Sequence, residues 1–220
     1  YDGGRLHGPA DVRGDTAFLP MGGSGFIIAN IEDPANIEEI SRLDFGPLFG
    51  PTHLSVHTTT PYIEKGLAIV NSEAIAENCG EALNFAGLVD ISDLTAPRLL
   101  SSFPMPQPPA GEPLDYFCNH GGRFGPHNQN QLQHNPLVEN QTNHVYMTYF
   151  NGGLRIFDIS TPVNPQEAGW FLPPDPTSRR GPLPRGALVV QSEDVLVDTR
   201  GYIYVSHKNQ GIWVMRYTGE

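Results

Sequence analysis

The sequence has few positive charges, little helical periodicity and no long apolar run, and each shortage excludes a class of protein. Its 220 residues hold 13 Lys and Arg against 24 Asp and Glu, a net charge of −11. This charge repels a phosphate backbone, so we expect no nucleic acid partner. No apolar run approaches the roughly 20 residues of a membrane helix, so no transmembrane segment is predicted. With helical spacing nearly absent, the fold must be made of strands.

Cysteine is also scarce, since Cys79 and Cys118 are the only two. Both lie in loop-like sequence. They form either one disulfide in an oxidising compartment or two free thiols. The chain begins at Tyr1 without an initiator Met or a signal peptide, which suggests a processed chain or a fragment. Only 17% of the residues are charged, which suits a secreted or periplasmic protein.

Several catalytic motifs are missing as well. The sequence has no Gly-x-Ser-x-Gly elbow, no P-loop, no Rossmann fingerprint and no His-Glu-x-x-His pair. Any chemistry must therefore come from side chains that the fold brings together from distant segments.

What the sequence does have is an internal repeat marked by its 24 glycines and 21 prolines. The clearest copy is the stretch 151–165, in which a strand at 154–159 lies between a Gly-Gly turn and a Pro-containing turn. Related copies occupy residues 25–36, 87–97 and 211–218. A tandem repeat of one strand-turn unit predicts a repeat architecture.

Each repeat can be divided into about four short strands separated by Gly, Pro, Asn and Asp turns, which predicts an all-β fold. Beyond the opening segments, the predicted strands are residues 16–21, 26–31, 37–45, 66–71, 86–91, 98–103, 145–150, 154–159, 167–172, 192–197, 202–206 and 212–217. Four strands per repeat are typical of β-propeller blades. We predict one propeller domain with about four four-stranded blades, at approximately 8–48, 50–105, 125–173 and 191–220.

The fourth repeat lacks an outer strand. Residues 1–7 would have to supply it for a four-bladed ring to close, and four blades is the lower limit for a propeller. The alternatives are that the chain is the C-terminal part of a larger, six- to eight-bladed ring, or that another chain completes the ring. We favour these alternatives.

The stretch 152–165, together with its lead-in at 145–150, resembles the LVIVD-repeat family of bacterial β-propellers. This resemblance covers the third repeat well and the others loosely, and it implies the fold but hardly any function. The chain is also distantly similar to the selenium-binding protein/methanethiol oxidase propellers, through its Gly-Leu-Arg and Asp-Ile-Ser frame. That similarity implies a histidine-bound metal.

The opening segments of the repeats supply candidate metal ligands. Aligned on their Gly-Pro dipeptides, they place Asp11, His53 and Asn128 at equivalent positions, with Asp194 in the fourth copy and His127 beside Asn128. The first strand of each blade lines the central channel of a propeller, so equivalent positions converge around its axis. The alternative is that these residues cap their own turns, as Asp and Asn commonly do.

We therefore predict a divalent transition metal, Fe, Cu, Ni or Zn, at the channel mouth. Its ligands would be His53 and His127 with one or more of His7, Asp11, Asp194 and His207. His53 and His57 lie about 13 Å apart on a straight strand, so they cannot both bind one ion unless the strand bends. His53 is preferred because it lies at the entry end of its segment. Calcium at the turns that follow the repeated strands, at Asn30, Asp90 and Asp158, is a minor alternative to a turn-stabilising role.

Three further residues are candidates for substrate binding: His120, Arg123 and Asn128. His120 and Arg123 flank a Gly-Gly pair, which either lets a ligand approach the backbone or simply makes a flexible turn.

Two functions follow. The first is a metal-dependent propeller enzyme that oxidises or hydrolyses a small substrate. The second is a non-catalytic secreted or cell-surface propeller whose long loops at 104–124 and 173–190 bind another protein chain.

Overall fold

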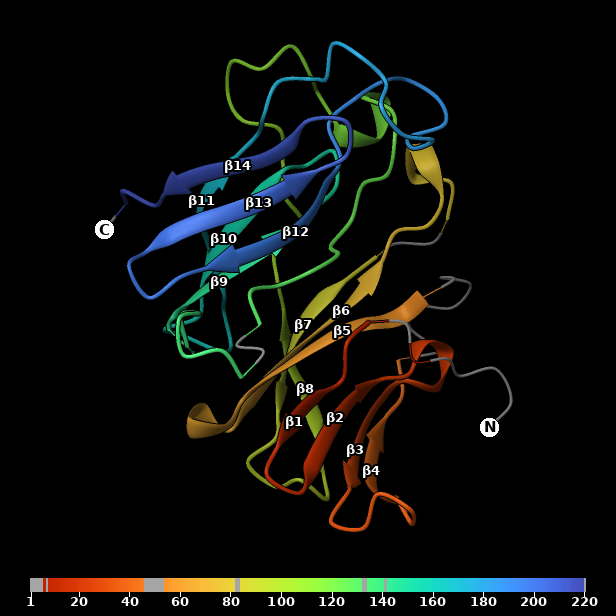
Figure 1. The fold of residues 1–220 in the computed structure, drawn as a ribbon, viewed down its shortest axis with the longest axis vertical. Helices are drawn as coiled ribbons and strands as arrows, with labels where there is room; N and C mark the ends of the chain where they lie inside the picture. The colour runs from red at the N-terminus through yellow and green to blue at the C-terminus, as the bar shows by residue number, and fades with distance from the viewer. Residues whose placement is uncertain are drawn as a thin grey trace. The chain divides into compact units, whose positions relative to one another are not determined.

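The computed structural model describes residues 6, 8–45, 54–81, 84–131, 134–140 and 142–219. Within this part the chain is all-β, with four antiparallel sheets and no α-helix (Figure 1). No helix in it is long and apolar enough to cross a membrane. The chain divides into two compact units, an N-terminal unit of residues 1–73 and 82–103 and a C-terminal unit of residues 74–81 and 104–220.

The N-terminal unit contains two four-stranded sheets. The first has β1 (Asp11–Arg13), β2 (Thr16–Pro20), β3 (Phe26–Asn30) and β4 (Glu38–Leu43). The second has β5 (Leu54–Tyr62), β6 (Leu67–Glu73), β7 (Ala86–Asp90) and β8 (Arg98–Ser102). Both sheets keep their strands in chain order, as expected for propeller blades.

The C-terminal unit contains two three-stranded sheets. One has β9 (His144–Thr148), β10 (Leu154–Asp158) and β11 (Gln166–Phe171). The other has β12 (Ser192–Val197), β13 (Tyr202–His207) and β14 (Gly211–Arg216). The prediction of four blades of consecutive antiparallel strands is confirmed, but only two of the four sheets have four strands in the described residues.

The expected first strand of the third blade is irregular. The main chain of residues 127–130 does bond to β9, through His127 N to Thr148 O (2.9 Å), Thr148 N to Asn128 O (2.9 Å) and Asn130 N to Tyr146 O (3.1 Å). The segment advances three residues, from His127 to Asn130, while β9 advances only two, from Thr148 to Tyr146. The extra residue leaves a single regular bridge, between Gln129 and Met147.

The repeated turn has the structural role predicted for it. Asn30, Asp90 and Asp158 end β3, β7 and β10, and their Oδ1 atoms accept the main-chain N–H two residues on, at 2.9, 3.0 and 2.7 Å. Such a bond turns the backbone out of the strand. It explains why the strands end one residue before the predicted ends at 31, 91 and 159.

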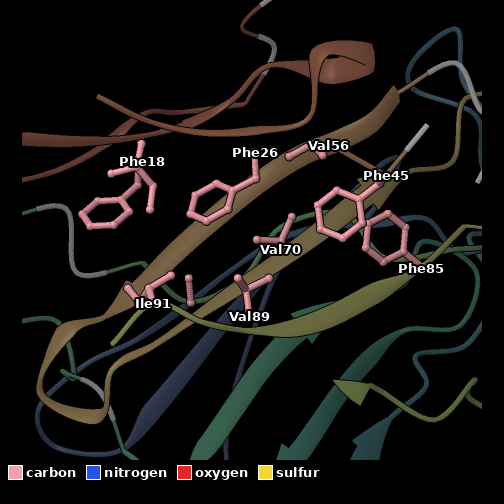
Figure 2. Close-up of a cluster of buried hydrophobic side chains, with 10 residues drawn as sticks. Phe18, Phe26, Phe45, Val56, Val70, Phe85, Val89 and Ile91 are labelled. Atoms are coloured by element: carbon pink, nitrogen blue, oxygen red, sulfur yellow. The ribbon is translucent and has the colours of Figure 1, made fainter. Parts of the chain in front are cut away.

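The core of the N-terminal unit lies between its two sheets. Figure 2 shows aromatic side chains from the first sheet facing aliphatic ones from the second. The buried cluster consists of Phe18, Phe26, Ile28, Phe45, Val56, Ala68, Val70, Phe85, Val89 and Ile91. Burial on this scale is the main favourable contribution to folding.

In the C-terminal unit the repeated strand buries a charge. The Arg155 side chain is 1% exposed, and its Nη1 lies 2.9 Å from Glu167 Oε1 on the neighbouring β11. Its Nε donates to Gly152 O at 2.8 Å, and its guanidinium lies 5.1 Å from the centre of the Phe117 ring. The arginine of the Gly-Leu-Arg frame is therefore a structural part of the blade.

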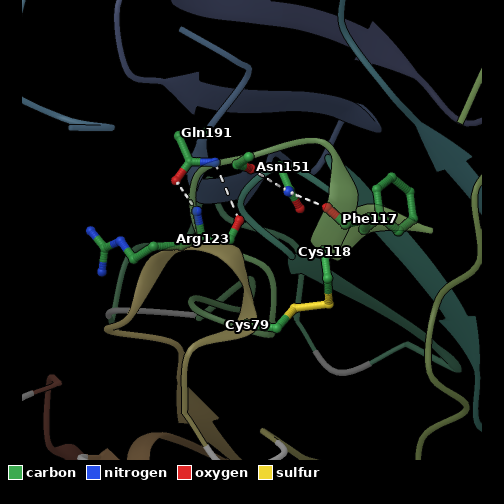
Figure 3. The surroundings of a disulfide bond; sticks show 7 residues. Cys79, Phe117, Cys118, Arg123, Asn151 and Gln191 are labelled. Carbon is green, nitrogen blue, oxygen red and sulfur yellow. Dashed lines mark hydrogen bonds between the residues drawn. A yellow bond between two sulfur atoms is a disulfide. The ribbon is translucent and has the colours of Figure 1, made fainter. Parts of the chain in front are cut away.

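The two cysteines form the predicted disulfide. Cys79 and Cys118 are bonded with their Cα atoms 5.4 Å apart, and both lie in the C-terminal unit (Figure 3). Asn151 supports the same loop, since its Nδ2 donates to Phe117 O at 2.9 Å and Gly121 O at 2.7 Å. Residues 74–81 are thereby tied to the loop that precedes the third blade.

The last blade exposes apolar side chains on its outer strand. Ile212 is 69% and Val214 56% exposed, although Trp213 packs against Phe171 with ring centres 5.5 Å apart. Within the described residues β14 pairs only with β13, whereas β3 and β7 each have a further partner.

Candidate functional site

The predicted metal ligands fall in different parts of the chain. His7 and His53 lie outside the described residues. The closing strand predicted at residues 1–7 also lies outside them, apart from Leu6. Asp11, in β1 of the N-terminal unit, is 6% exposed and forms an ion pair with Arg13 at 2.5 Å. His127, Asp194 and His207 all belong to the C-terminal unit.

The N-terminal unit holds a buried histidine–glutamate pair on adjacent strands. His57 is on β5 and Glu73 ends β6. Nε2 of His57 lies 3.3 Å from Oε2 of Glu73, and each side chain is 5% exposed. The other ring nitrogen, Nδ1, lies 2.7 Å from Oγ1 of Thr58, which fixes the orientation of the ring.

Sequence reasoning missed Glu73 and ranked His57 below His53. A straight-strand spacing was assumed for this segment, but the pairing of β5 with β6 shifts between Leu54 and Thr58. Leu54 pairs with Glu73 and Thr58 with Asn71, so four steps on β5 match only two on β6. This irregularity brings His57 to the end of β6. No pattern in the local sequence indicates the shift in pairing.

In the C-terminal unit three side chains meet at one backbone carbonyl. The oxygen of Glu193 lies 2.5 Å from His127 Nδ1 and accepts hydrogen bonds from Asn128 Nδ2 at 3.3 Å and Thr148 Oγ1 at 3.0 Å. Residues 127–128 therefore contact the opening strand of the fourth repeat at Glu193, one residue before the predicted Asp194.

The carboxylate of Glu193 is surrounded by basic groups. Oε1 lies 2.7 Å from Lys208 Nζ and 3.9 Å from Arg123 Nη2, while Oε2 lies 4.0 Å from His127 Nδ1. His127 and Arg123 also share the Phe150 ring, at 4.7 Å and 4.3 Å from its centre. This cluster is rich in donors for an anion.

Asp194 and His207 have separate environments. Asp194 Oδ1 accepts the N–H of Val195 at 2.9 Å, and burial raises the pKa of this carboxyl group. His207 Nδ1 lies 2.9 Å from Ser192 Oγ, and burial lowers the pKa of the imidazole to about 4. Taking each unit by itself, no three described His, Cys, Asp or Glu side chains bring ligand atoms within 4.8 Å of one another.

The predicted substrate-binding residues line different places. His120 Nε2 lies 2.9 Å from Asp175 Oδ2, and both residues line a cavity of about 520 Å³ walled by Leu114, Leu172 and neighbouring prolines. Arg123 instead lines a cavity of about 390 Å³. Asn128 contacts Glu193. The structure therefore places these three residues in three settings of the C-terminal unit.

Comparison with known proteins identifies the repeat. The family model of the LVIVD repeat matches residues 87–104 and 141–172, which are the second and third copies of the repeated strand. Two segments of the chain are therefore similar to the LVIVD repeat. The expected resemblance to this propeller family is thereby confirmed, whereas the similarity to the selenium-binding protein/methanethiol oxidase propellers stays a prediction. No curated protein matches the chain.

Several solved structures resemble the chain, and two of them are described here. The computationally designed Ika8 protein is 10% identical with a TM-score of 0.39, over 96% of this chain and 49% of the other. The α-L-arabinanase of Cellvibrio cellulosa is 15% identical with a TM-score of 0.45, over 98% of this chain and 74% of the other. The chain spans about half the length of the designed protein.

Proposed function

We propose that this propeller chain binds a divalent transition metal at His57 and Glu73 and uses it to oxidise or hydrolyse a small substrate. The supporting observation is the pair itself, with 3.3 Å between His57 Nε2 and Glu73 Oε2 and each side chain 5% exposed. A buried carboxylate is costly unless it is paired or bound to a metal, and a buried His–Glu pair is a donor set that a metal ion can use.

The donor chemistry fits the metals expected from the sequence. Imidazole nitrogen suits Fe, Cu, Ni and Zn, and a carboxylate adds negative charge. A ligand Nε2 requires its proton on Nδ1, and Thr58 Oγ1, 2.7 Å away, is placed to accept it. Such a second hydrogen bond orients a metal-binding ring. A bound metal would polarise a substrate or activate water.

A catalytic metal commonly has three protein ligands, and His57 and Glu73 supply two. Within the same unit, the predicted ligands His7, Asp11 and His53 are the candidates for the third. Replacing each of these in turn by Ala, with metal content as the readout, identifies which of them completes the site.

The test begins with metal uptake. The purified protein is stripped with a chelator, loaded separately with Fe²⁺, Cu²⁺, Ni²⁺ and Zn²⁺, desalted and analysed by plasma mass spectrometry. About one ion per chain is expected in the wild type, with loss of most of it in His57→Ala and Glu73→Gln. His134→Asn is the matched control, because His134 is exposed and Asn accepts its left-handed backbone (φ 54°).

Two results would overturn the proposal. Either the wild type takes up no metal, or His57→Ala and Glu73→Gln keep a full complement. The catalytic part is tested by oxygen consumption with small thiols and phenols and by hydrolysis of small esters. Should a chelator change only the melting temperature and none of these rates, the metal is structural and the protein is not this enzyme.

The disulfide is relevant to the cellular location of the protein. Disulfides persist in oxidising compartments and are rare in the cytosol. The Cys79–Cys118 bond is therefore consistent with the proposed secreted or periplasmic location.

A further inference from the structure

The last sheet of the C-terminal unit has one face that carries exposed apolar side chains. Val214 on β14 lies opposite Tyr204 on β13, and Tyr204 lies opposite Leu196 on β12. Residues directly opposite each other point to the same side of a sheet, and so does Ile212, two residues before Val214. Ile212 is 69% and Val214 56% exposed. We call these four residues the outer face of the fourth blade.

The opposite face of this sheet packs against the third blade. Leu154 and Ile156 of β10 are 0% and 3% exposed in that contact. The buried residues that β12 and β13 contribute to the same cluster are Val195, Val197, Ile203 and Val205. Neighbouring blades of this protein therefore bind each other through aliphatic side chains on facing sheets.

The repeat shows that the outer face occupies blade-packing positions. The stretches 25–28, 153–156 and 211–214 each consist of a glycine, an apolar residue, one further residue and a second apolar residue. In 25–28 and 153–156 both apolar residues are at most 3% exposed, because the following blade packs on them. In 211–214 they are the exposed Ile212 and Val214. The fourth blade thus presents the chemistry that the first and third blades bury against a further sheet.

A cavity extends the outer face beyond the edge of the sheet. It has a volume of about 510 Å³, and its lining includes Leu196 and Tyr204 from the face and Leu137 from the segment beside β12. That segment is held in place by the main chain, since Thr199 N donates to Leu137 O at 2.9 Å. Leu137 is 68% exposed. The apolar surface is therefore hollowed on one side, where side chains of a partner can enter.

The polar groups around the outer face already have partners. The Tyr204 hydroxyl donates to Asp198 Oδ2 at 3.0 Å, and Arg200 Nη2 lies 2.5 Å from the same oxygen. The Arg216 guanidinium lies over the Tyr202 ring, 4.0 Å from its centre. A sheet that covers the face would therefore leave no hydroxyl of Tyr204 unpaired, which is the usual cost of burying a tyrosine.

Among the third strands of the four blades, only β14 is exposed in the described residues. Each of β3, β7 and β10 is buried along its length up to a half-buried last residue, so both faces of those sheets are covered. In β14 every residue except Met215 is exposed. A head-to-tail contact between two molecules needs two different free faces, whereas a two-fold contact needs one face used by both. The partner that fits is therefore the same face of a second copy.

We propose that two copies of this chain associate around a two-fold axis through the outer face of the fourth blade. Two sheets packed face to face lie about 10 Å apart, as in a β-sandwich. Three strands of six residues make a face of about 14 Å by 20 Å. This is small beside the roughly 800 Å² per partner of a standard interface, so the contact is weak, with a dissociation constant in the micromolar range.

The test is sedimentation velocity of the full chain at concentrations from about 1 to about 200 μM, which span such a constant. The average mass should rise from that of the monomer towards that of the dimer. Val214→Asp and Ile212→Asp should each weaken association at least tenfold, because every dimer would bury two unpaired carboxylates. Val163→Asp is the matched control, since Val163 is 66% exposed on the turn after β10, away from this face.

A thiol at position 214 locates the contact. Cys79 and Cys118 are bonded to each other, so Val214→Cys introduces the one free thiol of the variant. In a two-fold contact the two introduced thiols face each other, and mild oxidation should link the copies into a covalent dimer. Val163→Cys should give far less of this product at the same concentration.

Three results would overturn the proposal. The wild type could stay monomeric throughout, or Val214→Asp and Ile212→Asp could associate as strongly as Val163→Asp. A monomer whose thiol at position 214 resists labelling would show that the chain covers this face itself. Because Ile212 and Val214 are exposed, their variants should keep the melting temperature of the wild type. Association that survives in His57→Ala separates this interface from the metal proposal.

Discussion

His207 is the residue whose environment most clearly sets a pH dependence. Its side chain is 5% exposed, and burial lowers its pKa to about 4, against about 6.5 in an unfolded chain. The folded state therefore holds fewer protons than the unfolded state between these pH values. Its contribution to stability is fully present above pH 6.5 and is lost as the pH falls towards 4.

The free energy of unfolding should therefore fall by about 3 kcal/mol between pH 7 and pH 4. His207→Gln should remove most of this slope, as measured by urea denaturation at a series of pH values. His144→Gln, which replaces a half-buried histidine on β9, serves as the control and should keep the slope. Asp90 and Asp198 have their pKa lowered to about 2 by hydrogen bonds, so they act mainly below pH 4. An identical slope in His207→Gln would show that other groups cause it.

At the scale of single residues, the sequence predicts contacts between residues that are close in the chain. It misses contacts between side chains on different strands. Asn30, Asp90 and Asp158 were assigned to turns because their partners lie two residues away. The approach of Glu73 to His57 depends on a shifted strand pairing, and a one-residue shift already reverses the side of a sheet that a side chain faces. No residue pattern within β5 encodes that shift.

Among the elements, the strand-entering turn of the repeat depends on glycine. Gly25 precedes β3 and Gly153 precedes β10, with φ of 88° and 77°. A Cβ atom at these positions would lie 2.4 Å from Leu43 O and 2.3 Å from Phe171 O, the last residues of the neighbouring strands β4 and β11. The same turn therefore fixes how β3 meets β4 and how β10 meets β11.

Gly153→Ala should destabilise the protein by about 2–5 kcal/mol, from a strained backbone and from the displaced carbonyl. Chemical denaturation measures the loss. Gly181→Ala is the control, because an added Cβ there meets nothing within 4 Å, and its effect should stay within about 0.5 kcal/mol. A loss at Gly153 no larger than that at Gly181 would mean that the turn adapts.

The predicted strands agree with the structure wherever a blade is regular. Period-two patterns and Gly or Pro turns located the later strands of every repeat to within a few residues. The opening strand of the third blade became a single bridge, because the segment 127–130 has one residue too many for β9. Such a bulge is a property of the pairing of two segments, and neither segment shows it alone.

For the whole molecule, the sequence predicts the repeat but not the grouping of its parts. Four copies of one strand-turn unit were enough to predict propeller blades. The assignment of residues 74–81 to the C-terminal unit was not predicted, because it depends on long-range contacts of Glu77, Asn78 and Cys79.

Removing the disulfide should lower the stability of the C-terminal unit. Cys79 and Cys118 are 39 residues apart, and closing a loop of that length contributes about 4 kcal/mol in the chain-entropy estimate. The Cys79→Ser, Cys118→Ser double variant should therefore unfold at a lower denaturant concentration than the wild type. A reducing agent should shift the wild type to the same midpoint and leave the variant unchanged. Equal midpoints for oxidised wild type and variant would contradict the prediction.

The same bond changes the covalent connectivity of the protein. The main chain passes from the N-terminal to the C-terminal unit after Glu73, returns at residue 82 and passes across again after Phe103. A single peptide-bond cut between Pro104 and Phe117 does not release two fragments, because Cys79 stays attached to Cys118. The two parts of the nicked chain stay covalently joined until the disulfide is reduced, so a protease cut in this loop and a reductant are both needed to separate them.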